Sequence, residues 1–183
     1  MEQMYYDIKE LLPIQREVNE KVREKLEAPV EFDQFMVAFN VELFEFFNEV
    51  GVWKWWKHSH KLNKENILDE LADCFAFFLS AVDVQDQLAR EDVADEVQTA
   101  LNELSEIHTN YRNDSDHDST DMVIDLIKYV GTDNEVEGVL MVERFAIAIF
   151  IVRLLFSDIT WEEIADAYRK KSEVNIQRQV ENY

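Results

Sequence analysis

Apolar positions recur every three or four residues over almost the whole chain, which is the spacing of an amphipathic helix. The pattern predicts helices over residues 4–26, 33–50, 64–84, 91–111, 120–130, 135–156 and 161–179. Asp33, Asn63 and Thr160 are the expected N-caps of three of these helices. Gly51 is expected to end the helix of 33–50, and Pro13 is expected to divide or kink the first segment. The prediction is an all-α helical bundle.

Composition strengthens the all-α prediction. Only three glycines and two prolines occur in 183 residues, which leaves little material for hairpins and tight turns. Hydrophobic residues make up 47% of the chain, enough for one domain with a sizeable core. The apolar run in 135–156 is interrupted by Glu143, Arg144 and Arg153, so we interpret it as a core helix and expect no membrane segment.

Charge and the single cysteine restrict the partners and the compartment. The formal net charge is −21, which disfavours nucleic-acid binding and makes an anionic ligand depend on metals or on a local group of cations. Cys74 lies in an apolar helical run and is expected to be a buried free thiol. The first residues lack the basic and apolar regions of a signal peptide. We therefore expect a cytoplasmic protein.

Two pairs of acidic residues stand inside strongly apolar helices: Glu42 with Glu45, and Glu70 with Asp73. A spacing of three residues places each pair on one helix face, and two helices joined by a short connection pack antiparallel. Four carboxylates that meet in this way repel one another unless a cation binds them. Oxygen-only ligands favour Mg²⁺ or Mn²⁺. The alternative, for the first pair together with Glu49, is a narrow solvent-facing stripe.

Three further groups suit a phosphorylated ligand. Lys54, Trp56 and Lys57 belong to the segment WKWWK, where lysines can neutralise phosphates and tryptophans can form a pocket wall; a loop packed on the core is the alternative. The last helix has a polar, basic face formed by Tyr168, Lys171, Asn175 and Arg178, with Tyr183 at the end. The alternative is a set of ordinary solvent-exposed side chains, which are common at this spacing on surface helices. Gln15 and Asn19 form an amide pair that can bind a base or a sugar, or face solvent.

Together these segments resemble the dimeric dUTPases of the all-α NTP pyrophosphatase superfamily. The resemblance is carried by QREVN (15–19), ELFEFFNE (42–49), WKWWK (53–57), ELAD (70–73) and YRKKSEVNIQRQVENY (168–183). The acidic element alone marks the superfamily, which includes MazG-like and dCTP-hydrolysing enzymes, and the other elements narrow it to the dUTPases. The resemblance implies a helical homodimer with one catalytic domain over residues 1–183, which converts dUTP to dUMP and pyrophosphate with Mg²⁺.

The resemblance also implies roles for individual residues. Glu42, Glu45, Glu70 and Asp73 would hold the metal, and Glu42 or Glu45, by preference Glu42, would activate the attacking water. Gln15 and Asn19 would belong to the nucleoside pocket, with Trp56 as a wall. The residues expected to contact phosphates or close over the nucleotide are Lys54, Lys57, Lys171, Asn175, Arg178 and Tyr183.

The chain departs from the family pattern in two places. Lys171 is followed by Ser172 where the family usually has Asn, and Asn182 stands where a Gly usually precedes the last Tyr. Residues 85–134 match no family motif and resemble the variable acidic insertion of phage-encoded members, which would place the protein in the cytoplasm of a bacterial host. Two alternatives follow: a pyrophosphatase of dCTP or several dNTPs, and a phage protein that binds a repressor partner through the insertion.

Overall fold

The computed structural model describes residues 1–57, 61–89, 92–132 and 137–181, and helices make up most of this part of the chain, with no strand. A short 3-10 helix, η1 (Ile8–Glu10), precedes α1 (Leu12–Arg23). The remaining helices are α2 (Phe32–Val50), α3 (Lys64–Ala89), α4 (Val93–Asp114), α5 (Ser119–Thr132), α6 (Glu137–Leu155) and α7 (Trp161–Val180). The all-α prediction is confirmed.

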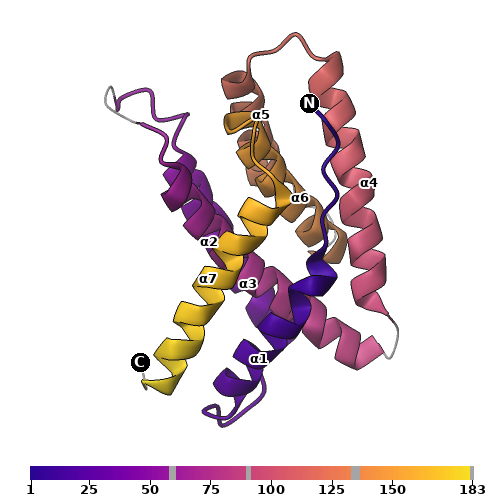
Figure 1. Cartoon of the computed structure of the whole chain (residues 1–183), viewed down its shortest axis with the longest axis vertical. Helices are drawn as coiled ribbons and strands as arrows, with labels where there is room; N and C mark the ends of the chain where they lie inside the picture. The colour runs from indigo at the N-terminus through magenta and orange to yellow at the C-terminus, as the bar shows by residue number, and fades with distance from the viewer. Residues whose placement is uncertain (58–60, 90–91, 133–136, 182–183) are drawn as a thin grey trace.

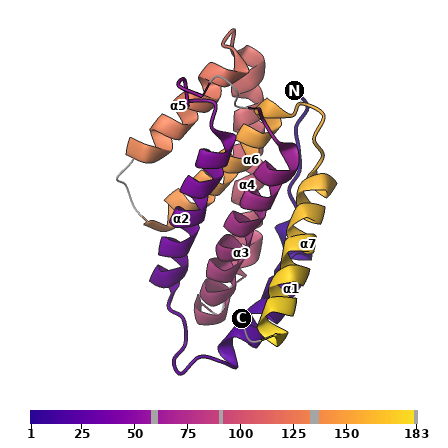
Figure 2. The same cartoon turned by 90° about the vertical axis from the view of Figure 1, so that its left-hand side faces the viewer.

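The helix α3 lies at the centre of the bundle and contacts α1, α2, α4, α6 and α7. The helices α1 and α7 lie side by side and descend toward the C-terminus in Figure 1, and Figure 2 shows α2 beside α3. The connection between α2 and α3 is short, so the two helices run antiparallel, as the sequence predicts. This arrangement brings the acidic faces of α2 and α3 together.

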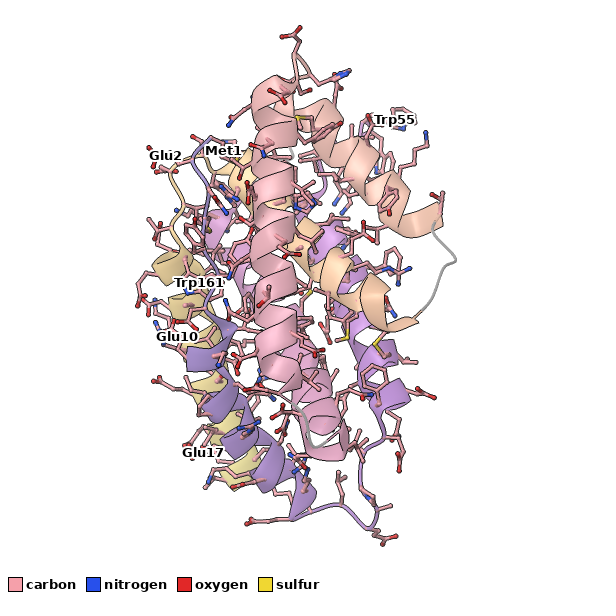
Figure 3. All side chains as sticks on the ribbon, turned by 90° about the vertical axis from the view of Figure 1, so that its right-hand side faces the viewer. Met1, Glu2, Glu10, Glu17, Trp55 and Trp161 are labelled. Carbon is pink, nitrogen blue, oxygen red and sulfur yellow. The ribbon has the colours of Figure 1, made fainter. Side chains whose placement is uncertain are left out.

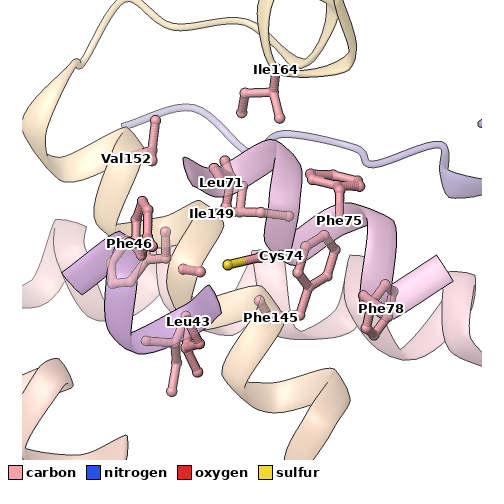
Figure 4. Close-up of a cluster of buried hydrophobic side chains, with 14 of the residues drawn as sticks. Leu43, Phe46, Leu71, Cys74, Phe75, Phe78, Phe145, Ile149, Val152 and Ile164 are labelled. Atoms are coloured by element: carbon pink, nitrogen blue, oxygen red, sulfur yellow. The ribbon is translucent and has the colours of Figure 1, made fainter. Parts of the chain in front are cut away.

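The core is aromatic and centred on α3 and α6, as Figure 4 shows. Residues 145–152 of α6 are all buried, and this stretch of the helix is apolar on every side. Phe145 stacks on Phe78 with ring centroids 4.1 Å apart and meets Phe75 edge-on at 4.4 Å. Cys74 is a buried free thiol, as predicted. Along the described residues, no helix combines the length and the apolarity needed to cross a membrane.

Most of the predicted helix ends are confirmed by cap contacts. Asn63 Oδ1 accepts hydrogen bonds from the backbone N–H groups of Glu65 (3.1 Å) and Asn66 (3.3 Å). Thr160 Oγ1 accepts from Glu163 N at 3.2 Å, while Glu163 Oε2 accepts from Thr160 N at 3.0 Å. Gly51 ends α2 with a φ of 56°, a left-handed conformation that glycine adopts without steric cost.

Several predicted boundaries are wrong, among them the end of the third helix, which is predicted at residue 84 and lies at Ala89. Asp33 is not the N-cap of α2, because the helix begins at Phe32 and Gln34 Oε1 accepts a hydrogen bond from the backbone N–H of Glu31 at 2.9 Å. The first helix is shorter than the predicted segment 4–26, because α1 begins at Leu12 and Pro13 lies in its first turn, where a missing N–H costs nothing.

Residues 1–7, before η1, run in non-helical form along α4 (Figures 1 and 3). Side chains of α4 bind this backbone at regular intervals: Asn102 Oδ1 accepts from Tyr6 N and Gln98 Oε1 from Ile8 N, both at 2.8 Å. Ser105 Oγ donates to the carbonyl of Met4 at 2.6 Å. These bonds replace the intrahelical ones, which explains why apolar periodicity alone did not produce a helix here.

Residues 85–134, predicted as a variable insertion, contribute α4 and α5 to the core. Leu101 of α4 and Met122, Val123 and Val130 of α5 are buried, and both helices pack on α6. The helices α4 and α5 thus cover the apolar surface of α6.

Candidate active site

A cavity of about 460 Å³ lies between α1, α2, α3 and α7. One part of its wall is acidic, with Glu42 and Glu45 of α2 and Asp73 of α3. A second part carries two amides of α1, and a third is the polar, basic face of α7. The apolar remainder of the wall consists of Val18, Val22, Val30, Phe35, Ala76 and Phe77. Segments distant in sequence therefore meet around one space of small-molecule size.

The acidic pairs of α2 and α3 come together as predicted. Glu42, Glu45 and Glu70 each offer a carboxylate oxygen, and these oxygens lie within 4.8 Å of one another. Asp73 lies one helical turn after Glu70, and its carboxylate forms an ion pair with Lys171 Nζ of α7 at 2.7 Å. The carboxylates are partly accessible rather than enclosed, so an ion can enter from the cavity.

Mutual repulsion and partial burial disturb the protonation of this group. Burial, and then the nearby charges of Asp73, Glu45 and Glu70, raise the pKa of Glu42 to about 7. Burial is also the main cause that raises the pKa of Glu70 and of Asp73, and Lys171 opposes both shifts. The carboxylates therefore hold more charge than their surroundings neutralise.

This donor set fits a hard divalent cation. All four acidic side chains offer oxygen, and no histidine or cysteine belongs to the group of possible ligands found among the described residues. An ion of charge +2 would offset the burial and the repulsion that together raise the pKa of Glu42. Oxygen ligands of this kind suit Mg²⁺ or Mn²⁺ better than Zn²⁺.

The basic face of α7 borders the same cavity through Lys171, Asn175 and Arg178. Lys171 Nζ bridges Asp69 and Asp73, at 2.7 Å from each. Its burial lowers the pKa of the ammonium group, but the two carboxylates outweigh this effect and raise it. Lys171 is thus a fixed positive charge beside the acidic cluster. Tyr183, predicted to close over the ligand, lies outside the described residues.

Gln15 and Asn19 are buried and line the cavity from α1. Gln15 Nε2 donates to Asn19 Oδ1 at 2.9 Å and to Ser80 Oγ at 3.0 Å. Tyr168 OH donates to Gln15 Oε1 at 2.9 Å, and Asn19 Nδ2 donates to Asp83 Oδ2 at 3.2 Å. The amide pair is therefore held in one orientation before any ligand binds, and the alternative of a solvated pair does not apply.

Lys54, Trp56 and Lys57 lie on the loop after α2 and do not line the cavity. Lys54 is buried, donates to the carbonyl of Asn48 at 2.5 Å and lies 5.5 Å from the ring centroid of Trp53. Trp56 is half exposed and packs edge-on against Trp53 and Trp55. Within a single chain these residues form a packed aromatic loop apart from the acidic cluster.

Sequence reasoning missed a second group of charged residues near the amide pair. Asp83 of α3 is fully buried and lies 2.8 Å from Arg16 Nε and 3.4 Å from Arg23 Nη2, both on α1. The signal was present, because Arg16, Asn19 and Arg23 share one face of α1 at helical spacing. Asp83 and Asp86 also have the three-residue spacing of the two acidic pairs, so the sequence held a second signal on α3.

Comparison with known proteins gives one family. A family model described as dUTPase matches residues 7–183, which is nearly the whole chain. No curated protein matches the chain.

Proposed function

The chain belongs to the dUTPase family, and we propose that it hydrolyses dUTP to dUMP and pyrophosphate with a divalent cation. Family membership supports a nucleotide pyrophosphatase in general. The observation that carries the proposal is the cavity that joins an acidic cluster, a cationic helix face and a pair of fixed amides. These are the three kinds of contact that a metal-bound nucleoside triphosphate needs.

Glu42, Glu45, Glu70 and Asp73 would hold the cation, Mg²⁺ by preference and Mn²⁺ as the substitute. Such an ion polarises the phosphoryl oxygens and lowers the pKa of water, which prepares both for an in-line displacement. Asp73 serves two partners in this scheme, because it also fixes the ammonium group of Lys171.

Glu42 is the proposed general base, with Glu45 as the other candidate. A general base has to lie within hydrogen-bond reach of the water that it deprotonates. Its position between the acidic cluster and the cavity suits a group that takes a proton from the attacking water.

Lys171, Asn175 and Arg178 would bind the phosphates, and Lys171 would exchange part of its contact with Asp69 for a phosphate oxygen. Tyr183, Lys54 and Lys57 are proposed to join them. Because Lys54, Trp56 and Lys57 lie outside the cavity of a single chain, their contact with the nucleotide requires a second copy or movement of the loop.

A homodimer forms part of the proposal. Val37, Val41 and Phe44 recur at helical spacing on α2, and 65%, 51% and 52% of each remains exposed. An apolar stripe of this kind suits an interface between two copies. Val41→Lys should convert a dimer to a monomer in sedimentation, whereas Leu88→Lys, which changes a more exposed apolar residue on α3, should not.

The test is the release of pyrophosphate from dUTP, dCTP, dTTP and dATP, each with Mg²⁺ and with a chelator. We expect release from dUTP that depends on Mg²⁺. Release from dCTP at the same efficiency would favour the alternative of a broader dNTP pyrophosphatase, and no release from any nucleotide would contradict the proposal.

A further inference from the structure

Asp83 is the centre of a polar network that joins α3 to α1. Its Oδ1 accepts from Arg16 Nε at 2.8 Å and from Gln87 Nε2 at 2.9 Å. Its Oδ2 accepts from Asn19 Nδ2 at 3.2 Å and from Arg23 Nη2 at 3.4 Å. The side chain is completely buried and forms ion pairs with two arginines.

A charged carboxylate only accepts hydrogen bonds, so Asp83 determines how the neighbouring amides are turned. Asn19 has to present its Nδ2 to Asp83, and its Oδ1 therefore faces Gln15 Nε2 at 2.9 Å. Gln15 in turn has to direct its Oε1 the other way, where it accepts from Tyr168 OH at 2.9 Å. The orientation of both amides follows from one buried charge.

The network leaves two hydrogen-bonding positions open within the described part of the chain. Gln15 Nε2 uses both of its protons, on Asn19 and Ser80, but Gln15 Oε1 accepts only one bond and retains a lone pair. Asn19 Nδ2 uses one of its two protons on Asp83. Both side chains line the cavity, so a bound base would meet one acceptor and one donor.

We propose that Asp83 is a positioning residue that fixes this donor and acceptor order and thereby selects uracil over cytosine. The inference rests on the proposed function, because it places the base of dUTP beside Gln15 and Asn19. Uracil presents an N3–H flanked by carbonyl oxygens: the N3–H suits Gln15 Oε1, and a carbonyl suits the remaining N–H of Asn19. Cytosine has a lone pair at N3, which would face the lone pair of Gln15, and such a mismatch is strongly rejected.

The substitution Asp83→Asn tests the inference. An asparagine at this position can donate as well as accept, so Asn19 and Gln15 are free to turn and the order of donor and acceptor is lost. Binding of dUMP and of dCMP, measured by calorimetry in Mg²⁺ buffer, should give a dCMP-to-dUMP ratio of dissociation constants that falls at least about tenfold in the variant. An unchanged ratio would overturn the inference, even if both affinities fell together.

Two further variants separate orientation from stability. Asp86→Asn removes another acid of α3 that binds the same arginine, at 2.7 Å from Arg16 Nη2, but does not contact Asn19. It should leave the ratio of dissociation constants unchanged. If Asp83→Asn does not fold, the double variant Arg16→Gln/Asp83→Asn removes the carboxylate together with one of its cations and should show the same loss of discrimination.

The readout distinguishes this inference from the proposed function. Binding of the monophosphates requires no hydrolysis, so a protein that binds dUMP selectively but releases no pyrophosphate would contradict the proposed function alone. A wild-type protein that does not prefer dUMP to dCMP would overturn the role of Asp83, whether or not it hydrolyses triphosphates.

Discussion

The helix α3 carries two acidic regions whose negative charge is neutralised to different degrees by the surrounding residues. Near its start, Glu70 and Asp73 meet Glu42 and Glu45, with Lys171 as a cation in ion-pair contact. Roughly 15 Å further along the helix, Asp83 is fully buried but has two arginines and two amides around it. The protein satisfies the second region internally and leaves an excess of negative charge in the first.

This difference separates the proposed cation site from a carboxylate that supports the fold. An added cation does not stabilise carboxylates whose charge the protein already neutralises, whereas it strongly stabilises carboxylates that repel one another. Burial, and then the charges of the neighbouring carboxylates, raise the pKa of Glu42 to about 7. The two regions should therefore respond differently to the same kinds of substitution.

The largest expected effect concerns hydrolysis at the acidic cluster. Glu45→Gln removes a proposed ligand and should lower kcat/KM for dUTP by about 10³-fold, because a bound ion supplies several kcal/mol of charge stabilisation. Steady-state kinetics measures it. The matched control is Glu49→Gln, one turn further along α2, where the side chain accepts from Asn66 Nδ2 at 3.1 Å and lies outside the cluster. Equal losses in both variants would contradict the assignment.

The second effect concerns stability at Asp83. Asp83→Ala should lower the free energy of unfolding by about 2–3 kcal/mol, since it leaves Asn19 without an acceptor and two arginines without their buried partner. The arginine side chains are 41% and 38% exposed, which limits the loss. Urea unfolding checks the value. Asp86→Ala should cost less than about 1 kcal/mol, and a larger loss there than at Asp83 would reverse the comparison.

The third effect is the pH dependence of the metal-free protein. Because the pKa of Glu42 rises from 4.5 to about 7 on folding, the native state holds a proton between these values that the unfolded chain has lost. The free energy of unfolding should therefore fall as the pH rises through this window. We expect about 1 kcal/mol, after allowance for the partial exposure of the group.

Urea unfolding at a series of pH values, with a chelator present, measures this dependence. Glu42→Gln is the control, because the difference in stability between wild type and variant isolates one group from the other acidic residues. Mg²⁺ should stabilise the wild type more at pH 8 than at pH 6, where it competes with the proton. A wild-type profile parallel to that of the variant would be incompatible with the raised pKa.

The smallest predicted effect is a stabilisation, whereas most substitutions destabilise a protein. In the metal-free protein Glu70→Gln should raise the free energy of unfolding by about 0.5–1 kcal/mol, because it removes a like charge from the cluster. Thermal unfolding with a chelator detects it, and the order should reverse with saturating Mg²⁺, which only the wild type binds with all its ligands. Destabilisation in both conditions would show that Glu70 is satisfied internally.

The local elements of the fold were predictable because their causes are local. Asn63, Thr160 and Gly51 act within one turn of their own position, and each performs its predicted role. The N-terminal residues were not predictable in this way. Their backbone bonds are made by Gln98 and Asn102, which lie some 90 residues away in the chain.

The acidic pairs Glu42/Glu45 and Glu70/Asp73 and the face of Lys171 and Asn175 follow from the sequence alone, since helical spacing decides which side chains share a face. Their meeting in one cavity, the exclusion of Lys54 and Trp56 from it, and the pairing of Asp83 with Arg16 were decided only by the tertiary structure. The physical reason is that tertiary contacts join residues distant in the sequence: a carboxylate next to other carboxylates can bind a cation, and one next to an arginine forms an internal ion pair. Tertiary packing, and not the spacing of residues along the sequence, determines which residue lies next to a carboxylate.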